Sequence, residues 1–321
     1  MGKTTMNTHG FVRLAAAVPP VIIADPEKNV IAMADIARQA DAQGVKLLLF
    51  PELSITGYSC ADLFSQTSLQ KDALRALEAL ARQTKDLTTS LVVGLPLLVD
   101  DQLFNVAAVI WRGAILGLVP KTYIPTYKEF YEGRWFSPAN RLRSKTVVVA
   151  GQHIPIGTDL IFDFSRATPN LVLGIEICED LWMPIAPSSY YAIYGATVLA
   201  NLSASDAIVS KAEYRRDLGS HQSAKCCAAY LYASCSSAGV ENEGESTHDV
   251  VYDGHVMIAE NGRIISESKR FESVPQLIVS DVDLEHLVRE RAVTTSFSQA
   301  AEENPRQMRR IDCSAALGDN A

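Results

Sequence analysis

The stretch LLLFPELSITGY, residues 47–58, joins an entirely apolar run to a loop whose first charged residue is Glu52. A short run without polar alternation is typical of a strand that is buried on both faces. Runs of similar character occur at 91–95, 171–177 and 197–201. The chain is therefore expected to contain a largely buried sheet, with Glu52 directly beyond the end of one strand.

Stretches with helical spacing alternate with these strands. Asp25 and Pro26 supply an N-cap and a first-turn proline for the first helix. Two tight hairpins are indicated by Arg112-Gly113 and by Asn261-Gly262, each of which separates two apolar runs. Helices are predicted at 27–43, 68–83, 187–194 and 211–230, and further strands at 11–18, 106–111, 114–119, 231–237, 254–259, 263–268 and 277–282.

Helices that alternate with strands, together with hairpins, indicate a mixed sheet, or two sheets, covered by helices. The predicted fold class is therefore α/β, in a single layered domain over residues 11–290 that follows an N-terminal extension at 1–10. After Thr295 the sequence turns polar and loses its periodicity. Residues 291–321 are accordingly predicted to form a tail or linker.

The composition excludes several classes of protein. The 321 residues include 29 Lys and Arg against 37 Asp and Glu, a formal net charge of −8, which argues against a strongly basic nucleic-acid binder. Six scattered cysteines without a CxxC pair indicate a reducing, cytoplasmic setting. The longest apolar runs reach about half of the roughly 20 residues that a bilayer span needs, so no membrane partner is expected. The apolar N-terminal stretch is interpreted as a first strand and not as a signal peptide.

Three predicted strands end in a side chain that is able to take part in catalysis. Glu52, Lys121 and Cys178 each stand directly beyond an apolar run, in a loop whose position is fixed by the rigid strand before it. Taken alone, each has an ordinary explanation: a capping or salt-bridged glutamate, a solvated lysine, and a buried, inert cysteine. Cys178 is nevertheless flanked by acidic residues and is thus not in an apolar setting.

Together these three side chains supply what acyl transfer requires. A thiol nucleophile needs a base that takes its proton, and the reaction needs donors aimed at the developing oxyanion. None of the six histidines stands at a strand end beside a thiol or serine partner, which disfavours a Cys–His hydrolase. No HxH, HExxH or CxxC spacing is present, so no metal ligand is predicted.

The segments PELSITGY (51–58), PKTYIPTYKEFYE (120–132) and EICEDLW (176–182) resemble the three motifs of the nitrilase, or carbon-nitrogen hydrolase, superfamily. Within it, the chain most resembles the N-terminal glutaminase domains of bacterial glutamine-dependent NAD⁺ synthetases. The resemblance covers about residues 13–282 and includes VLANLSAS (198–205) and GESTHDVVYDG (244–254).

This resemblance implies a four-layer αββα sandwich and assigns roles to the strand-end residues. Cys178 would be the nucleophile, Glu52 the general base, and Lys121 the electrostatic stabiliser of the tetrahedral intermediate. A second glutamate usually stands four residues after the motif proline. Here that residue is Glu129, which follows Pro125 and is expected to hold Lys121 and the substrate amide in place.

The resemblance also implies a pocket for L-glutamine. We expect Glu132 to meet the α-ammonium group, and Ser205 with Lys211 to meet the α-carboxylate. The backbone N–H of Glu179 would stabilise the oxyanion together with Lys121. The aromatic members are equally consistent with ordinary packing, and Lys211 with a surface charge at a helix start. The expected lining comprises Tyr58, Tyr127, Phe130, Glu132, Glu179, Trp182, Ser205 and Lys211.

The implied reaction is hydrolysis of L-glutamine to glutamate and ammonia through a cysteine thioester, a step that needs no cofactor. A complete synthetase of this kind also carries a domain with an SGGxDS-type loop, to which ATP and Mg²⁺ would belong, and the sequence has no such motif. That domain would be a partner, and relatives in the superfamily suggest a homo-oligomer. Two other interpretations stay open: a free-standing amidase or carbamoylase for another small amide, and a non-catalytic interaction domain.

Overall fold

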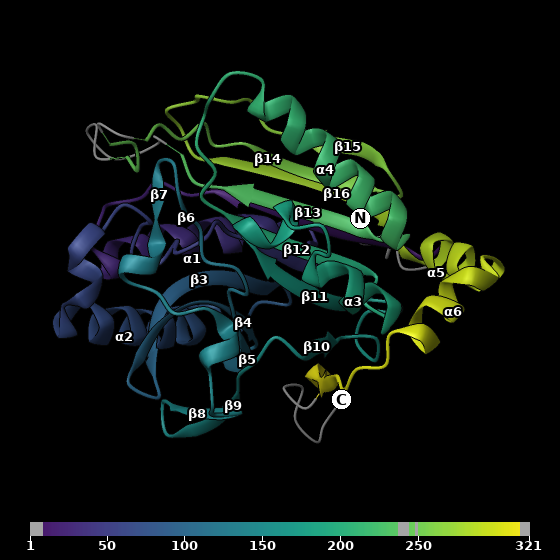
Figure 1. Ribbon diagram of the computed structural model, residues 1–321, viewed down its shortest axis with the longest axis horizontal. Coiled ribbons are helices and arrows are strands. Elements are labelled where there is room, and N and C mark those ends of the chain that lie inside the picture. The colour runs from purple at the N-terminus through teal and green to yellow at the C-terminus, as the bar shows by residue number, and fades with distance from the viewer. Residues whose placement is uncertain (1–8, 237–243, 248–249, 315–321) are drawn as a thin grey trace.

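The computed structural model describes residues 9–236, 244–247 and 250–314, and these residues contain two large sheets (Figure 1). The predictions made for residues 1–8, 237, 248–249 and 315–321 lie outside this part of the chain. The first sheet has, in spatial order, the strands β16 (Gln276–Asp283), β1 (Phe11–Val18), β2 (Leu47–Leu49), β3 (Ser90–Val99), β4 (Gln102–Trp111) and β5 (Ala114–Pro120). The second has β15 (Arg263–Glu267), β14 (Val256–Glu260), β13 (Ala229–Ser234), β12 (Val198–Ser203), β11 (Val172–Ile177), β10 (Leu160–Asp163) and β17 (Arg309–Asp312).

Each sheet has parallel strands at its centre and antiparallel strands toward its edges. In the first, β1 pairs in parallel with β2 and β2 with β3, whereas β16, β4 and β5 join by antiparallel pairing. In the second, β11, β12 and β13 are parallel. The parallel centre explains the continuous apolar runs in the sequence, because such strands are covered on both faces.

The two sheets pack face to face, and helices cover their outer faces. Leu47 and Leu49 point into the core between the sheets, whereas Leu48 and Phe50 point outward to the helices α1 (Pro26–Ala42) and α2 (Thr67–Gln83). On the other side, α3 (Pro187–Ile193) and α4 (Lys211–Cys226) pack on the second sheet. This arrangement confirms the predicted αββα sandwich and decides between one mixed sheet and two in favour of two.

Both predicted tight hairpins are present. Asn261 and Gly262 connect β14 to β15, and Arg112 and Gly113 connect β4 to β5, all four with positive φ as a two-residue turn of the primed type requires. Smaller elements were not predicted: the hairpins β6 (Thr126–Tyr127)–β7 (Phe130–Tyr131) and β8 (Thr146–Val149)–β9 (Gln152–Pro155), and the 3₁₀ helices η2 (Ala61–Ser65), η3 (Glu132–Arg134), η4 (Ala139–Arg141) and η5 (Cys178–Trp182).

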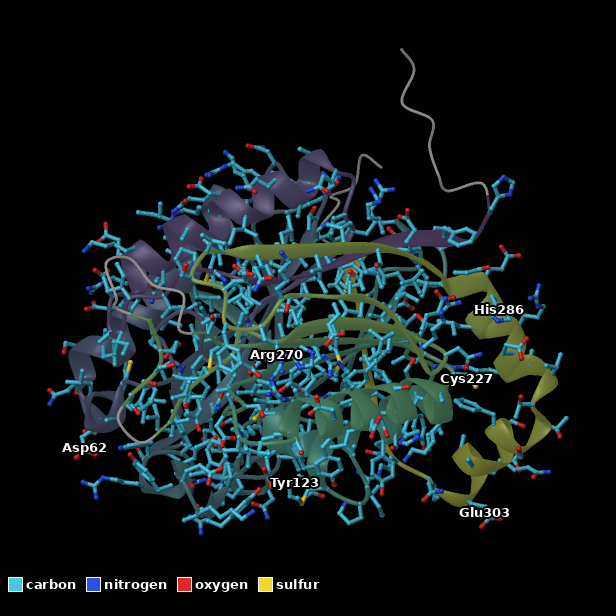
Figure 2. The ribbon with its side chains drawn as sticks, turned by 90° about the horizontal axis from the view of Figure 1, so that it is seen from above. Asp62, Tyr123, Cys227, Arg270, His286 and Glu303 are labelled. Carbon is cyan, nitrogen blue, oxygen red and sulfur yellow. The ribbon has the colours of Figure 1, made fainter. Side chains whose placement is uncertain are left out.

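The segment predicted as an irregular tail is structured up to residue 314. It contains the end of α5 (Leu284–Val293), the helix α6 (Thr295–Glu303) and the strand β17. Figure 2 shows α5 and α6 at one end of the sandwich, carrying His286 and Glu303. β17 pairs in parallel with β10, and Arg309 and Arg310 form ion pairs with Asp159, directly before β10, and Asp163, at its end. These partners lie about 150 positions away, so local periodicity carried no sign of them. That the segment links this domain to another stays a prediction.

Candidate active site

Glu52 lies directly beyond β2, in a loop pressed against β3. A Cβ atom at Gly94 would lie 2.2 Å from the backbone nitrogen of Leu53, so only glycine permits this approach. The Glu52 carboxylate is fully buried, and its Oε1 accepts hydrogen bonds from Nδ2 of Asn105 at 2.6 Å and from Nζ of Lys121 at 2.7 Å. Burial raises the pKa of Glu52 to about 7, although Lys121 and Asn105 oppose this rise.

Lys121 lies beyond the end of β5, between two carboxylates. Besides Glu52, its Nζ contacts Oε1 and Oε2 of Glu132 at 2.7 and 3.0 Å. Burial alone would lower the pKa of Lys121, but the charges of Glu132 and Glu52 raise it well above its usual value. The ammonium group is therefore charged and held in a fixed place, as a group that stabilises a developing oxyanion must be.

Cys178 lies at the end of β11, where the strand turns into η5. Its φ of +47° is the left-handed conformation, which costs energy for a residue other than glycine and often accompanies functional sites. The turn is fixed because the Cys178 N–H donates to Oδ1 of Asn201 at 3.2 Å. Burial, followed by the charge of Glu52, raises the pKa of the Cys178 thiol well above its usual value, so the resting group is a thiol.

A thiol in this state needs a base that takes its proton during attack. The second carboxylate oxygen of Glu52, Oε2, is buried and has no hydrogen-bond partner within the part of the chain that the structure describes. Buried carboxylate oxygens normally accept at least one hydrogen bond. Glu52 therefore offers a free acceptor oxygen, and its charge reaches the Cys178 thiol, whose pKa it raises.

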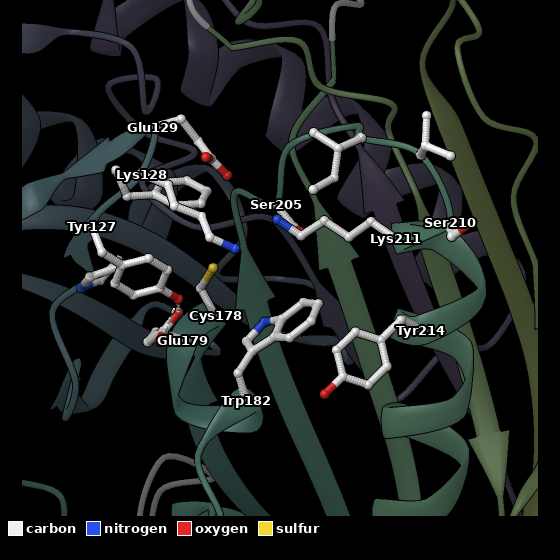
Figure 3. A pocket seen from close by; sticks show the side chains of 14 residues that line it. Tyr127, Lys128, Glu129, Cys178, Glu179, Trp182, Ser205, Ser210, Lys211 and Tyr214 are labelled. Atoms are coloured by element: carbon white, nitrogen blue, oxygen red, sulfur yellow. Dashed lines mark hydrogen bonds between the residues drawn. The ribbon is translucent and has the colours of Figure 1, made fainter.

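A cavity of about 440 Å³ opens above Cys178. Figure 3 shows the Cys178 sulfur facing the space between the β6–β7 hairpin, which carries Tyr127 and Lys128, and the first turns of α4, which carry Lys211 and Tyr214. Pockets of this size are typical of sites for small molecules. The lining residues are Pro125, Tyr127, Lys128, Glu129, Phe130, Cys178, Glu179, Trp182, Ser205, Ile208, Val209, Ser210, Lys211 and Tyr214.

The cavity carries groups of both charges in defined positions. Nζ of Lys211 lies 5.3 Å from the ring centres of both Phe130 and Trp182 and forms an ion pair with Asp206. The Tyr127 hydroxyl donates to Oε1 of Glu179 at 2.8 Å. 

The hydroxyl of Ser205 is buried at the cavity wall and has no hydrogen-bond partner among residues 9–236, 244–247 and 250–314. A buried hydroxyl without a partner carries a desolvation cost that no hydrogen bond offsets. Lys211, Glu179 and Ser205 thus place a cation, an anion and a hydroxyl group at the cavity wall.

The structure brings Glu52, Lys121 and Cys178 together, and most of the predicted pocket residues line the cavity. Two predictions about glutamates are wrong. The carboxylates on Lys121 are those of Glu52 and Glu132, whereas Glu129 lies in the cavity wall. Lys128 and Glu129 form the two-residue turn of the β6–β7 hairpin, with Lys128 at φ +51°, so the chain reverses before η3 turns Glu132 inward.

Glu132 and Tyr58 therefore lie behind the site and not in its lining. The Tyr58 hydroxyl donates to Oε1 of Glu132 at 2.7 Å. With both oxygens on Lys121, Glu132 is not placed to meet a substrate ammonium group, whereas Glu129 and Glu179 both line the cavity.

Sequence reasoning missed several members of the site. Asn105 left a signal, a lone amide within the apolar strand 103–111. Tyr214 lies three positions after Lys211 and thus on the same face of α4. Ile208 and Val209 left no signal, because an exposed loop is placed at the cavity mouth only by tertiary structure.

Residues 13–291 match the carbon-nitrogen hydrolase family. The chain belongs to this family. A glutamine-dependent NAD(+) synthetase of Mycobacterium tuberculosis is 45% identical over 289 residues, which are 90% of this chain and 41% of that protein. The carbon-nitrogen hydrolase chain described here thus spans about two fifths of the length of that relative.

Solved structures share the fold. The glutamine-dependent NAD(+) synthetase of Cytophaga hutchinsonii superposes with a TM-score of 0.72 at 26% identity, over 84% of this chain and 43% of that one. A nitrilase-superfamily amidase from Nesterenkonia gives a TM-score of 0.64 at 22% identity, over 92% of this chain and 99% of the amidase. At that identity the second comparison supports the fold alone.

Neither a metal centre nor a membrane span emerges from the residues that the structure describes. Within them, no three His, Cys, Asp or Glu side chains are grouped as a metal ion would require. No helix in the same residues has both the length and the apolar character needed to cross a bilayer.

Proposed function

We propose that this carbon-nitrogen hydrolase chain hydrolyses L-glutamine to L-glutamate and ammonia through a thioester on Cys178. The observation that carries the proposal is the buried Glu52–Lys121–Glu132 cluster, in which Oε2 of Glu52 has no hydrogen-bond partner among the described residues while the charge of Glu52 acts on the Cys178 thiol. The relatives described as glutamine-dependent NAD(+) synthetases support glutamine as the substrate.

In the first half of the reaction, Oε2 of Glu52 accepts the thiol proton while Sγ of Cys178 attacks the side-chain amide carbon of glutamine. The carbonyl oxygen becomes an oxyanion that Lys121 and the N–H of Glu179 stabilise. That N–H lies in the first turn of η5, where backbone donors have no acceptor within the helix. The C–N bond then breaks, Glu52 returns the proton to the nitrogen, and ammonia leaves with the γ-glutamyl thioester in place.

In the second half, Glu52 takes a proton from a water molecule that attacks the thioester carbon. The C–S bond breaks, the proton passes to the sulfur, and glutamate leaves. Glu132 acts in both halves by holding Lys121, the role that the sequence had suggested for Glu129. No cofactor takes part in either half.

For recognition, we propose that Glu179 meets the α-ammonium group and that Ser205 and Lys211 meet the α-carboxylate. The Ser205 hydroxyl has no partner among the described residues, and Lys211, which is paired with Asp206, lies between two aromatic rings where a second carboxylate can reach it. Tyr127 orients Glu179, while Phe130 and Trp182 form the walls for the aliphatic part of the substrate.

We further propose that the ammonia serves an NAD⁺ synthetase domain that uses ATP and Mg²⁺, and that the chain works in the cytoplasm as a homo-oligomer. The similarity to synthetases over their N-terminal two fifths supports the first part. The relation of residues 291–321 to such a domain belongs to the same proposal.

The test is release of ammonia and glutamate by the purified chain given L-glutamine, with asparagine and a simple aliphatic amide as alternative substrates. Cys178→Ala should abolish release, and Cys227→Ser, at the far end of α4, should leave it unchanged. Mass spectrometry after an acid quench should find the glutamyl adduct on the peptide that contains Cys178. Faster turnover of another amide would instead support a free-standing amidase or carbamoylase.

A further inference from the structure

Glu245 is a fully buried carboxylate that the proposed mechanism does not use. Its Oε1 and Oε2 accept the backbone N–H of Tyr58 at 2.8 and 2.9 Å, and Oε2 also accepts the N–H of Ser59 at 3.0 Å. The Ser59 hydroxyl donates to the backbone oxygen of Glu245 at 2.6 Å. Glu245 thus holds the loop that begins at Glu52 from its far end.

This placement is costly for a charged group. No cation contacts Glu245 among the described residues, and burial raises the pKa of its carboxyl to about 7, partly offset by the N–H groups of Tyr58 and Ser59. An acceptor in a neutral side chain would hold two N–H groups at lower cost. The feature therefore calls for an explanation beyond packing.

The explanation lies in what Tyr58 does with its other end. Its hydroxyl donates to Glu132, and Glu132 holds the ammonium group of Lys121. Burial, followed by the charge of Glu132, raises the pKa of Tyr58 well above its usual value, so the hydroxyl remains a donor. The Tyr58 ring is also held at its edge by Tyr252, with centres 5.9 Å apart. Because Tyr252 holds the ring, the position of the Tyr58 hydroxyl relative to Glu132 depends on the backbone of Tyr58. Glu245 fixes that backbone.

We propose that Glu245 is a positioning residue for the active-site cluster, which acts through Tyr58 and Glu132 to place the ammonium group of Lys121. The proposal rests on the catalytic role proposed above for Lys121. Glu245 lies 187 positions from Tyr58 in the sequence and touches neither the cavity nor the reacting atoms. Its effect should therefore appear in the rate of the chemical step and not in substrate affinity.

The loop 52–59 passes close to the Glu245 carboxylate at Gly57. Gly57 has φ +85°, and a Cβ atom there would lie 3.4 Å from both Glu245 oxygens and 3.3 Å from Val21. In Glu245→Gln, one acceptor oxygen becomes an NH₂ group that faces backbone donors. If the NH₂ group takes the place of Oε1, it lies within hydrogen-bond distance of the Tyr58 N–H, so we expect the backbone of Tyr58 to shift.

The test is a double-mutant cycle of Glu245→Gln and Tyr58→Phe, with kcat and KM for glutamine measured in all four proteins. Loss of a hydrogen bond to a charged group predicts that each single variant lowers kcat about tenfold, with KM changed less than about twofold. If Glu245 acts through Tyr58, the double variant also loses about tenfold, and not about a hundredfold. Multiplication of the two effects, or an unchanged kcat in Glu245→Gln, would overturn the proposal.

A second readout needs no glutamine. The rate of iodoacetamide alkylation at Cys178, followed on its peptide by mass spectrometry across pH, reports how the Lys121–Glu52 cluster activates the thiol. In the double variant Glu245→Gln/Tyr58→Phe, the shift of this pH profile should be smaller than the sum of the shifts in the two single variants. A chain that releases no ammonia but shows this coupling refutes the proposed function and keeps the inference, whereas additive shifts refute the inference.

Two controls separate positioning from general damage. Glu260→Gln removes a half-buried carboxylate with a raised pKa from β14, outside the site, and should change neither readout. Circular dichroism shows whether Glu245→Gln is folded. If it is not, Glu245→Asp, which keeps the charge and shortens the reach, replaces it in the cycle with the same expectation.

Discussion

Oδ1 of Asp180 accepts the backbone N–H of Tyr123 at 2.9 Å, and this contact ties the strand end of Cys178 to the strand end of Lys121. The same carboxylate accepts the N–H groups of Thr122 at 3.2 Å and of Ile177 at 3.0 Å. The two strand ends belong to different sheets, β11 in one and β5 in the other. Asp180 therefore sets the distance between thiol and ammonium group across the sandwich.

Asp180→Asn should weaken this tie, because an amide offers one acceptor oxygen and turns its NH₂ group toward backbone donors. We expect the free energy of unfolding to fall by about 1–3 kcal/mol, and glutamine hydrolysis to fall with it. Urea unfolding and the ammonia assay measure the two effects. Asp86→Asn, an exposed change of the same chemistry, should alter stability by no more than about 0.5 kcal/mol. Equal losses in both variants would contradict the role of Asp180.

The raised pKa of Glu52 predicts a specific pH dependence of hydrolysis. Glu52 acts as a base only when it is ionised, so activity should rise with pH through a midpoint near its pKa of about 7. Well below that midpoint, kcat/KM should fall about tenfold for each pH unit. A profile that is flat between pH 5 and pH 8 would exclude Glu52 as the base.

Asn105→Leu should shift this profile. The Asn105 amide donates to Glu52 at 2.6 Å and thereby lowers its pKa, so loss of the donor must raise that pKa further. The midpoint is expected to move up by about one pH unit, with little change in the plateau rate. A downward shift would mean that Asn105 does not stabilise the ionised carboxylate.

Lys121→Met should leave Glu52 and Glu132 as adjacent buried carboxylates without a cation. Breaking a buried pair on one side costs about 3–5 kcal/mol of unfolding free energy, and activity should be lost. The deficit should shrink between pH 7.5 and pH 5, because Glu52, whose pKa burial has already raised, is then protonated. Lys71→Met, on the exposed face of α2, is the matched control. A deficit of equal size at both pH values would show that packing and not charge is responsible.

Ser205→Ala separates binding from stability. The Ser205 hydroxyl has no hydrogen-bond partner in the part of the chain that the structure describes, so its removal should not lower the unfolding free energy. If it meets the substrate carboxylate, KM for glutamine should rise about tenfold with little change in kcat. The comparison is Ser203→Ala, which removes a buried hydroxyl that donates to Asn201 at 2.7 Å and should therefore destabilise the protein. An unchanged KM in Ser205→Ala would show that the Ser205 hydroxyl does not bind the substrate.

The layered α/β fold class and the three strand-end residues were accessible from the sequence for one physical reason, whereas the four-layer sandwich was implied only by the family resemblance. Strands that are covered on both faces are largely apolar, so a charged or nucleophilic residue directly after such a run stands out. Glu52, Lys121 and Cys178 all do so, and the fold brings their strand ends together.

What the sequence could not provide depends on chain reversals and distant contacts. Whether Glu129 or Glu132 faces Lys121 is decided by the left-handed turn at Lys128, since that turn sets the direction of each following side chain. Tyr58 was assigned to the pocket because nothing near it in the chain reveals its hold on Glu132. Likewise β17 forms on partners about 150 positions away.

The pairing of β17 with β10 has a consequence for solubility. Without it, β10 would end the second sheet with a row of open N–H and C=O groups, a template on which another chain can add a strand. With it, the outermost strand carries Arg309 and Arg310 side by side, and both are already engaged by carboxylates of the same molecule. Charged residues on an outermost strand disfavour edge-to-edge association, so β17 should lower the tendency of this sheet edge to aggregate.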